Sequence, residues 1–409
     1  MGCRCKGNNT ADNQVWTNCE ELEMEIDYLK PFSIRFPTKV EFGWEISKSA
    51  GDLIPNVGNH ILFVTQENLL YLFTTRDILK SLNDTGKTIR IYTDVQSEPD
   101  SASVDLAGSY LRKEQIDLII AVGGGSVIDV AKALSVSISI SKPVWEYVGY
   151  TGKQPFPIES PLTPVVAIPT TSGTGSEVTP YAVLYHRELQ RKATIVSPHL
   201  TPLVAIVDPS LTSSLPQAIT AYTGADALSH AIESYLNVPN RTPLSAMLSI
   251  EAIQAASKAL VNAVTNGSDH TARSLMSWAS LLSGLSISIT GTGLSHAMAE
   301  VLGGLTHMAH GLTVAAILPA VLKLFEEDYS LSLDTLRKAL GDDDTPAYQQ
   351  VNHMWRAAGL PLSVQDLGID KSYQLKIRQA TLTNAGWAMS PNPIPLGAKD
   401  VDKILAYLW

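Results

Sequence analysis

The stretch DLIIAVGGGSVIDVAKAL, residues 117–134, determines the fold class. Its first six residues form an apolar run of strand length, and its last eight place apolar side chains at helical spacing. The glycines between them, Gly123, Gly124 and Gly125, let the backbone turn tightly and approach a ligand without Cβ atoms in the way. With Ser126 they precede a helix N-terminus, whose free N–H groups favour a phosphate. The stretch therefore predicts a strand–turn–helix unit that is either a phosphate site or a plain glycine-rich turn.

Apolar, β-branched runs of the same length recur through the first half of the chain. They are residues 61–65 (ILFVT), 89–93 (IRIYT), 165–168 (VVAI) and 203–207 (LVAIV). Runs without a polar alternation are typical of strands buried on both faces of a parallel sheet. Helix-like stretches lie between them, for example residues 102–115. This βαβ alternation predicts a doubly wound α/β sheet.

The pattern changes after about residue 213. Long segments with helical spacing follow, and strand-like runs disappear; the segments are residues 217–236, 244–264, 271–288 and 311–326. We expect a tail over residues 1–30, an α/β dinucleotide-binding domain over 31–212 and an all-α metal-binding domain over 213–409. A cleft between two such domains is a common place for a ligand.

Composition excludes several classes of protein. The chain has 409 residues, of which 45% are hydrophobic and 17% charged, which is incompatible with general disorder. Its formal net charge is −10, so we expect no nucleic-acid partner and no anionic membrane surface, because both require a basic face. No window approaches ~18 unbroken apolar residues, the length of a membrane-spanning helix.

All three cysteines, Cys3, Cys5 and Cys19, lie near the start of the chain. Half a metal site and a lipidation signal are two interpretations, but Lys6 breaks the myristoylation pattern. We expect a flexible tail with incidental thiols, in which disulfides hold nothing together. The polar start also lacks a secretory apolar region, so we expect a cytoplasmic protein.

A second loop, PTTSGTGSE at residues 169–177, also follows a strand-like run. Hydroxyl side chains, including those of Thr170, Thr171 and Thr174, make it a dense hydrogen-bonding surface for a phosphate, a ribose or a nicotinamide amide. A structural turn is the alternative. Lys192, just before the strand-like ATIV, is a cation that could serve the same ligand or lie on the surface.

Four residues of the second half have the pattern of a metal site. Asp226 and His230 are four residues apart in TGADALSHAIESY, so a helix places them on one face. His296 and His310 lie fourteen residues apart in GLSHAMAEVLGGLTHMAHG. One carboxylate and three imidazoles form an O/N donor set for a divalent transition metal. These donors do not separate Fe²⁺ from Zn²⁺.

Four motifs in this order, GGGSVIDVAK, PTTSGTGSEVTP, TGADALSHAIESY and GLSHAMAEVLGGLTHMAHGL, resemble the iron-containing (group III) alcohol dehydrogenase family. The resemblance covers roughly residues 35–409. It implies the dehydroquinate synthase-like fold of that family, with an N-terminal parallel-sheet domain, an all-α metal domain and the active site between them.

The resemblance also implies the functions of individual residues. The metal ligands would be Asp226, His230, His296 and His310. The cofactor pyrophosphate would be held by Gly124, Gly125 and Ser126, and the remaining cofactor contacts would come from Thr170, Thr171, Thr174 and Lys192.

One departure from the family pattern lies four residues after His296. The family usually carries a further histidine there, credited with proton relay, and this chain has Glu300. A carboxylate on the same helix face is either a proton relay or a structural group. His307 is not at a family ligand position, and we expect it beside the metal ligands or on the surface.

A second departure follows the strand-like run ILFVT. NAD-preferring members commonly carry an aspartate at the next position, where it binds the adenosine 2′-hydroxyl and repels a 2′-phosphate. This chain has Gln66, with Glu67 adjacent. We therefore expect use of NADPH, with NADH tolerated.

The expected activity is metal-dependent, NAD(P)H-linked hydride transfer between a small aldehyde and its primary alcohol, in the direction of aldehyde reduction. The alternative is a dehydroquinate-synthase-like lyase that uses NAD and metal without net redox. Such a lyase needs several cations in its cleft, whereas the metal-bearing segments here are small and apolar. A third interpretation is a nucleotide-binding protein that has lost its catalytic activity. By analogy we expect a homodimer or a higher homo-oligomer.

Overall fold

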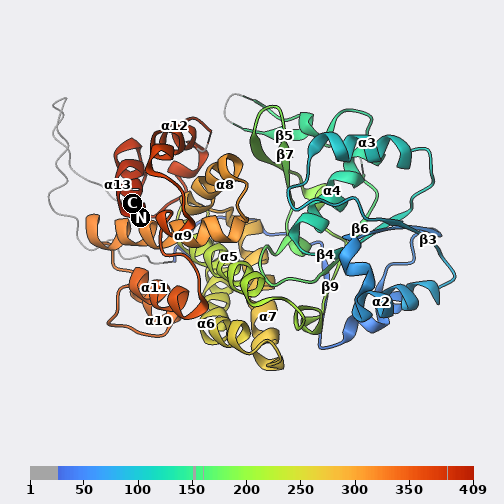
Figure 1. Cartoon of the computed structure of the whole chain (residues 1–409), viewed down its shortest axis with the longest axis horizontal. Helices are drawn as coiled ribbons and strands as arrows, with labels where there is room; N and C mark the ends of the chain where they lie inside the picture. The colour runs from blue at the N-terminus through green and yellow to red at the C-terminus, as the bar shows by residue number, and fades with distance from the viewer. Residues whose placement is uncertain (1–25, 151–152, 160, 385) are drawn as a thin grey trace.

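The structure is a computed structural model that describes residues 26–409 except 151–152, 160 and 385. The predicted tail, with Cys3, Cys5 and Cys19, lies almost entirely outside these residues. Figure 1 shows two halves, one with the strands and helices α2 to α4 and one built from helices α5 to α13. This is the predicted fold class, an α/β half followed by a helical half.

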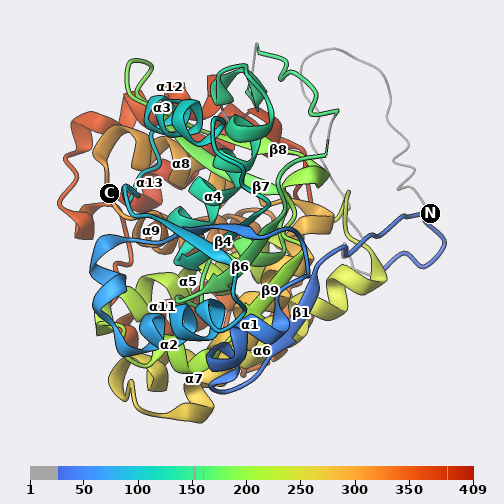
Figure 2. The ribbon, with the colours of Figure 1, turned by 90° about the vertical axis from the view of Figure 1, so that its right-hand side faces the viewer.

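The α/β half contains a six-stranded parallel sheet in the order β1-β9-β6-β4-β2-β3. Its strands are β1 (Lys39–Phe42), β2 (His60–Val64), β3 (Thr88–Tyr92), β4 (Leu118–Gly123), β6 (Val165–Pro169) and β9 (Val204–Val207). In Figure 2, β4, β6, β9 and β1 follow one another across the molecule. All five strand-like runs predicted from the sequence form strands of this sheet, within one or two residues at each end.

Helices cover both faces of the sheet, which explains the unbroken apolar runs. Alternate residues of β4 pack into different clusters: Ile119 contributes to the cluster shared with α3 and α4, and Ile120 to the one shared with α2. Both side chains are fully buried. The helices are α1 (Ala50–Leu53), α2 (Phe73–Asn83), α3 (Ser101–Leu111) and α4 (Gly125–Ser139).

A second, antiparallel sheet was not predicted. It has the order β5-β8-β7, with β5 (Val148–Gly149), β7 (Tyr181–His186) and β8 (Arg191–Val196). The sequence analysis placed Lys192 just before a strand, and this was wrong, because Lys192 pairs with Tyr185 inside the β7–β8 ladder. These strands are only partly buried, and β8 begins with two charged residues, unlike the central strands.

The helical half matches the predicted helical segments, and no strand occurs in its described residues. Its helices are α5 (Gln217–Leu236), α6 (Pro243–Thr265), α7 (His270–Thr290), α8 (Leu294–Thr306), α9 (His310–Lys323), α10 (Asp334–Leu340), α11 (Ala347–Ala358), α12 (Gln374–Asn384) and α13 (Ala398–Leu408). The last predicted segment splits in two, since α9 continues as a π-helix over Leu324–Asp328.

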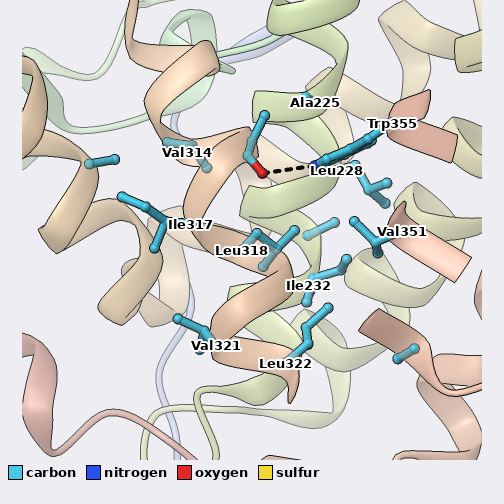
Figure 3. Close-up of a cluster of buried hydrophobic side chains, with 14 of the residues drawn as sticks. Ala225, Leu228, Ile232, Val314, Ile317, Leu318, Val321, Leu322, Val351 and Trp355 are labelled. Atoms are coloured by element: carbon cyan, nitrogen blue, oxygen red, sulfur yellow. Dashed lines mark hydrogen bonds between the residues drawn. The ribbon is translucent and has the colours of Figure 1, made fainter. Parts of the chain in front are cut away.

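The core of this half lies between α5, α9 and α11. Figure 3 shows Leu228, Leu318 and Trp355 packed side by side in this cluster. The indole N–H of Trp355 donates to the backbone oxygen of Ala315 at 2.9 Å, so the buried ring leaves no unpaired donor. This packing fixes α5 and α9, which both carry candidate metal ligands.

Helix α6 is long and apolar enough to span a membrane by length and composition alone. Half of its apolar 18-residue stretch is buried, and residues such as Ile253 and Leu260 contribute to the core of the helical half. Thr242 caps its first turn in a reciprocal pair with Ser245. The same composition suits a core helix, and α6 packs as one here.

Candidate active site

The four candidate metal ligands converge from three helices of the helical half. Asp226 and His230 lie one turn apart in the middle of α5. His296 lies in the first turn of α8, and His310 is the first residue of α9. A Cβ on Gly311 would lie 2.1 Å from the backbone oxygen of Tyr222, so a glycine is required for α9 to begin this close to α5.

Their side-chain atoms form one cluster. Asp226 Oδ1 lies 3.4 Å from His296 Nε2 and 3.7 Å from His310 Nε2, and one ligand atom from each of these three residues lies within 4.8 Å of the others. The ring of His230 stacks on that of His296, with 4.2 Å between centroids. Its Nδ1 lies 4.0 Å from Asp226 Oδ2. The structure thus brings together all four residues that the sequence singled out.

The chemistry of this cluster fits a metal ion. Three of its buried atoms, Asp226 Oδ1, His230 Nδ1 and His296 Nε2, have no hydrogen-bond partner. Buried polar atoms in folded proteins nearly always have partners, so three unpaired atoms in one cluster call for a bound group. One carboxylate oxygen and imidazole nitrogens suit Fe²⁺ or Zn²⁺. The coordination of a metal by these residues stays a prediction.

The protonation states of most residues in the cluster suit metal coordination. Burial lowers the pKa of His230 to about 4 and that of His310 to about 3, so both rings are neutral, as metal ligands must be. Burial alone would raise the pKa of Asp226, but the surrounding imidazoles outweigh it and hold that pKa well below its usual range. The carboxylate is therefore ionised.

Glu233 is a functional residue that the sequence analysis missed. It lies seven residues after Asp226 on α5, and its carboxylate hydrogen-bonds His296 Nδ1. It also accepts backbone N–H bonds from Gly293 at 3.0 Å and Ser295 at 2.6 Å. One buried carboxylate thus caps the N-terminus of α8 and orients the His296 ring with Nε2 toward Asp226.

The charge of Glu233 also sets the protonation of His296. Burial opposes a charged ring, but the carboxylates of Glu233 and Asp226 outweigh burial and raise the pKa of His296 to about 10. A metal at Nε2 would displace that proton while Glu233 kept the one on Nδ1. The sequence signal for Glu233 was its helical spacing of seven from Asp226.

Replacing Glu233 should weaken metal binding. In Glu233→Gln the ring of His296 loses its anionic partner, and we expect the affinity for iron or zinc to fall roughly 10- to 100-fold. Bound metal after dialysis against graded chelator measures this. Glu251→Gln is the control, because Glu251 lies on α6 and accepts an exposed bond from Trp278 at 3.3 Å, outside the metal cluster. Equal metal retention in both variants would contradict the orienting function of Glu233.

The two glycine-containing loops pack against each other at the carboxyl ends of β4 and β6. The strands pair up to Gly123 and Pro169, and Thr170 N donates to Gly123 O at 3.0 Å. A Cβ on Gly124 would lie 3.3 Å from the Thr171 side chain. Ligands of open parallel sheets bind at this edge, and the following α4 directs its N-terminus there.

The other predicted cofactor residues surround this edge. Ser126 Oγ donates to the backbone oxygen of Ser97 at 2.7 Å, and Thr174 Oγ1 accepts from Ser176 N at 3.2 Å. Gln66 follows β2, next to β4, where Thr65 Oγ1 donates to Val122 O at 2.7 Å. A glycine-lined cradle with the hydroxyls of the second loop beside it fits a dinucleotide, and the individual cofactor contacts stay predictions.

A buried ion cluster beneath the second loop was also missed. Lys132 is fully buried and donates to the backbone oxygens of Ser176 at 2.6 Å, Thr179 at 2.9 Å and Tyr181 at 2.8 Å. Asp129 accepts from Ser176 Oγ at 2.8 Å. Asp129 therefore anchors the second loop.

Gly125 is where a side chain should disrupt the cradle. An added Cβ would lie 2.6 Å from Thr174 Cγ2 and 3.0 Å from its Oγ1. We expect Gly125→Ala to push the loops apart and raise the Kd for reduced nicotinamide cofactor about tenfold or more, measured by fluorescence titration. Gly43→Ala is the control, because a Cβ there meets atoms no nearer than 3.7 Å. An unchanged Kd would mean that the cofactor binds elsewhere.

The metal cluster and the loops open into one cavity of about 880 Å³ between the two halves. Asp226, His296 and His310 line it from the helical half, and Thr174 and Lys192 line it from the other. Glu300, one turn after His296 on α8, also lines it, and burial raises the pKa of this carboxyl to about 7. Its predicted relay of protons stays a prediction.

Comparisons with known proteins agree with this geometry. Residues 37–209 match the family described as iron-containing alcohol dehydrogenase, and residues 220–409 match the C-terminal part of that family. The long-chain-alcohol dehydrogenase 1 of Geobacillus thermodenitrificans is 34% identical over 384 residues, which cover 91% of this chain and 95% of the relative.

Solved structures of oxidoreductases share the fold over most of the chain. A 1,3-propanediol oxidoreductase superposes with a TM-score of 0.84 at 29% identity, covering 93% of this chain and all of the other. The sulfoacetaldehyde reductase of Bifidobacterium kashiwanohense, solved with NAD⁺, gives a TM-score of 0.81 at 27% identity, covering 93% and 99% of the two chains.

The fold and these matches define an enzyme of the oxidoreductase class. The chain belongs to the iron-containing alcohol dehydrogenase family, whose members interconvert alcohols and aldehydes.

Proposed function

We propose that the protein is a metal-dependent, NAD(P)H-linked reductase that converts a small aldehyde to its primary alcohol by hydride transfer. The observation that carries the proposal is the shared cavity, in which unpaired buried atoms of Asp226 and His296 face the same space as the second glycine-containing loop. Family membership supports the interconversion of alcohol and aldehyde; the direction and the size of the substrate are our proposal.

The mechanism assigns one task to each part of the site. When bound, a divalent metal would polarise the carbonyl oxygen as a Lewis acid and a nicotinamide would supply the hydride. Asp226, His230, His296 and His310 would hold the metal, and Glu233 would keep His296 Nε2 directed at it. Small and apolar side chains such as Ala297 and Val301 line the cavity and exclude water from the reacting atoms.

A proton must reach the alkoxide that reduction creates. Glu300 is the acidic side chain of the cavity wall one helical turn from His296, and its carboxyl oxygen would exchange that proton with water. This assigns to Glu300 the function that family members give to a histidine. A structural use of the same carboxyl is the alternative.

Removal of His296 tests the proposed function. The protein is purified without chelator, its iron and zinc are measured, and NADPH and NADH oxidation is followed with a panel of small aldehydes. We expect stoichiometric metal and aldehyde-dependent turnover, and loss of both in His296→Ala. Metal without net nicotinamide oxidation would shift the assignment to a lyase, and neither metal nor turnover would leave a nucleotide-binding relic.

The choice between NADPH and NADH is proposed to depend on Gln66. A neutral side chain after β2 removes the charge that would repel a 2′-phosphate. We expect Gln66→Asp to lower kcat/KM for NADPH about tenfold, which is ~1.4 kcal/mol, with a smaller effect on NADH. A wild-type preference for NADH, or no change in the NADPH to NADH ratio on substitution, would contradict this.

We also propose that the enzyme acts in the cytoplasm as a homodimer or higher homo-oligomer, without nucleic-acid or membrane partners. The net charge of −10 supports the absence of an anionic partner. Sedimentation of the purified protein measures the assembly, and a monomer at micromolar concentration would contradict it.

A further inference from the structure

Glu98 links three parts of the molecule next to Lys192, which lines the cavity. It lies between β3 and α3, and one carboxylate oxygen is 2.5 Å from Lys192 Nζ while the other is 2.8 Å from His307 Nδ1. Partial burial would raise the pKa of Glu98, but the bonds from Lys192 and His307 outweigh it and lower that pKa. The carboxylate is therefore charged and engaged on both oxygens. We call Glu98, Lys192 and His307 the clasp.

The backbone around Glu98 is fixed to the cofactor-loop side of the cleft. Ser97 O accepts the hydroxyl of Ser126, and Pro99 O accepts the backbone N–H of Tyr185 at 2.8 Å. Asp100 caps the first turn of α3 through Ser103 N at 3.1 Å. Glu98 is thus held from both neighbours, so its carboxylate has a defined position relative to the glycine loop.

His307 belongs to the helical half and lies close in sequence to the candidate metal ligand His310. It ends α8 in a left-handed conformation, φ 58°, three residues before His310. That conformation is unfavourable for a residue with a Cβ, so contacts must hold it. Its ring meets the bond from Glu98 and the edge of Tyr185, with 5.6 Å between ring centroids. Both contacts come from the α/β half.

Lys192 is the third member of the clasp, and it lines the cavity. Its side chain is 11% exposed, and that of Glu98 is 21% exposed. A Cβ on Gly303 of α8 would lie 3.3 Å from Lys192 Nζ, so the ammonium passes close to the helix that carries His296.

We propose that Glu98 and His307 are positioning residues that clasp the two halves of the cleft around the nicotinamide cofactor, by fixing Lys192 in the cavity and the turn that presents His310. The inference rests on the proposed use of a nicotinamide cofactor. It assigns to His307 a function distinct from metal binding, since its ring contacts Glu98 and Tyr185 and lies outside the ligand cluster.

The experiment substitutes Glu98 and His307 singly and together. His307→Asn keeps a residue that tolerates a left-handed backbone and removes the imidazole, and Glu98→Gln keeps the shape and removes the charge. The Kd for NADPH and for NADH is measured by fluorescence titration, with KM, kcat, bound metal and Tm alongside. Glu114→Gln is the matched control, since Glu114 also forms an ion pair, with Arg90, but away from the cavity.

We expect each clasp variant to raise Kd and KM for the cofactor about three- to tenfold, with Tm no lower than in the control. The double variant should be no worse than Glu98→Gln alone, because the two residues act through one contact. Multiplying effects in the double variant, or an unchanged Kd in both single variants, would overturn the clasp.

The proposed function can fail separately. If the wild type binds NADPH or NADH without reducing any aldehyde, the Kd comparison still tests the clasp. If Glu98→Gln does not fold, His307→Asn still gives the comparison from the exposed member, whose side chain is 55% exposed. If the wild type binds neither nucleotide, the clasp proposal is overturned along with its cofactor.

Discussion

The site depends on one buried carboxylate, that of Asp226, held charged among imidazoles. Burying an ion without partners is strongly unfavourable, so the folded chain must supply compensating groups. His230, His296 and His310 lie around it but leave Asp226 Oδ1 and His296 Nε2 unpaired. Two buried atoms of the cluster thus have no hydrogen-bond partner of their own. The helices of the helical half hold these groups together in an arrangement that fits a cation.

That support depends on close backbone contacts that only glycine permits. A Cβ on Gly173 would lie 2.9 Å from Thr223 of α5, and one on Gly175 would lie 2.4 Å from the Cα of Gly284 on α7. The second loop therefore sits directly on the helices of the metal half. Together with Gly311 against α5, these contacts determine how near the candidate metal ligands lie to the sheet edge where the cofactor is expected. Backbone packing therefore brings the two candidate binding regions together.

The sequence predicted the elements that have a strong periodic signal. Central strands such as β4 are buried on both faces and α5 has helical spacing, so both could be located, and the motif residues followed from their spacing. The β7–β8 hairpin was missed because its half-buried strands have a weaker pattern. Glu233 and Glu98 were missed for a different reason. Each acts through a contact between segments far apart in the chain, 63 residues to His296 and 209 to His307, and a single sequence does not show such pairs.

These two glutamates show how the site is built in layers. Glu233 lies within the helical half and fixes the ring of one candidate ligand, so its effect should be confined to the metal. Glu98 lies in the other half and reaches the turn before His310, so its effect should extend to the geometry of the cleft. In the proposed reaction a hydride would pass between a carbon held by the helical half and one held by the α/β half, and small displacements slow such a transfer steeply. An enzyme assembled from two halves therefore needs a contact that fixes their relative position, and the charged Glu98 between Lys192 and His307 lies where that contact is required.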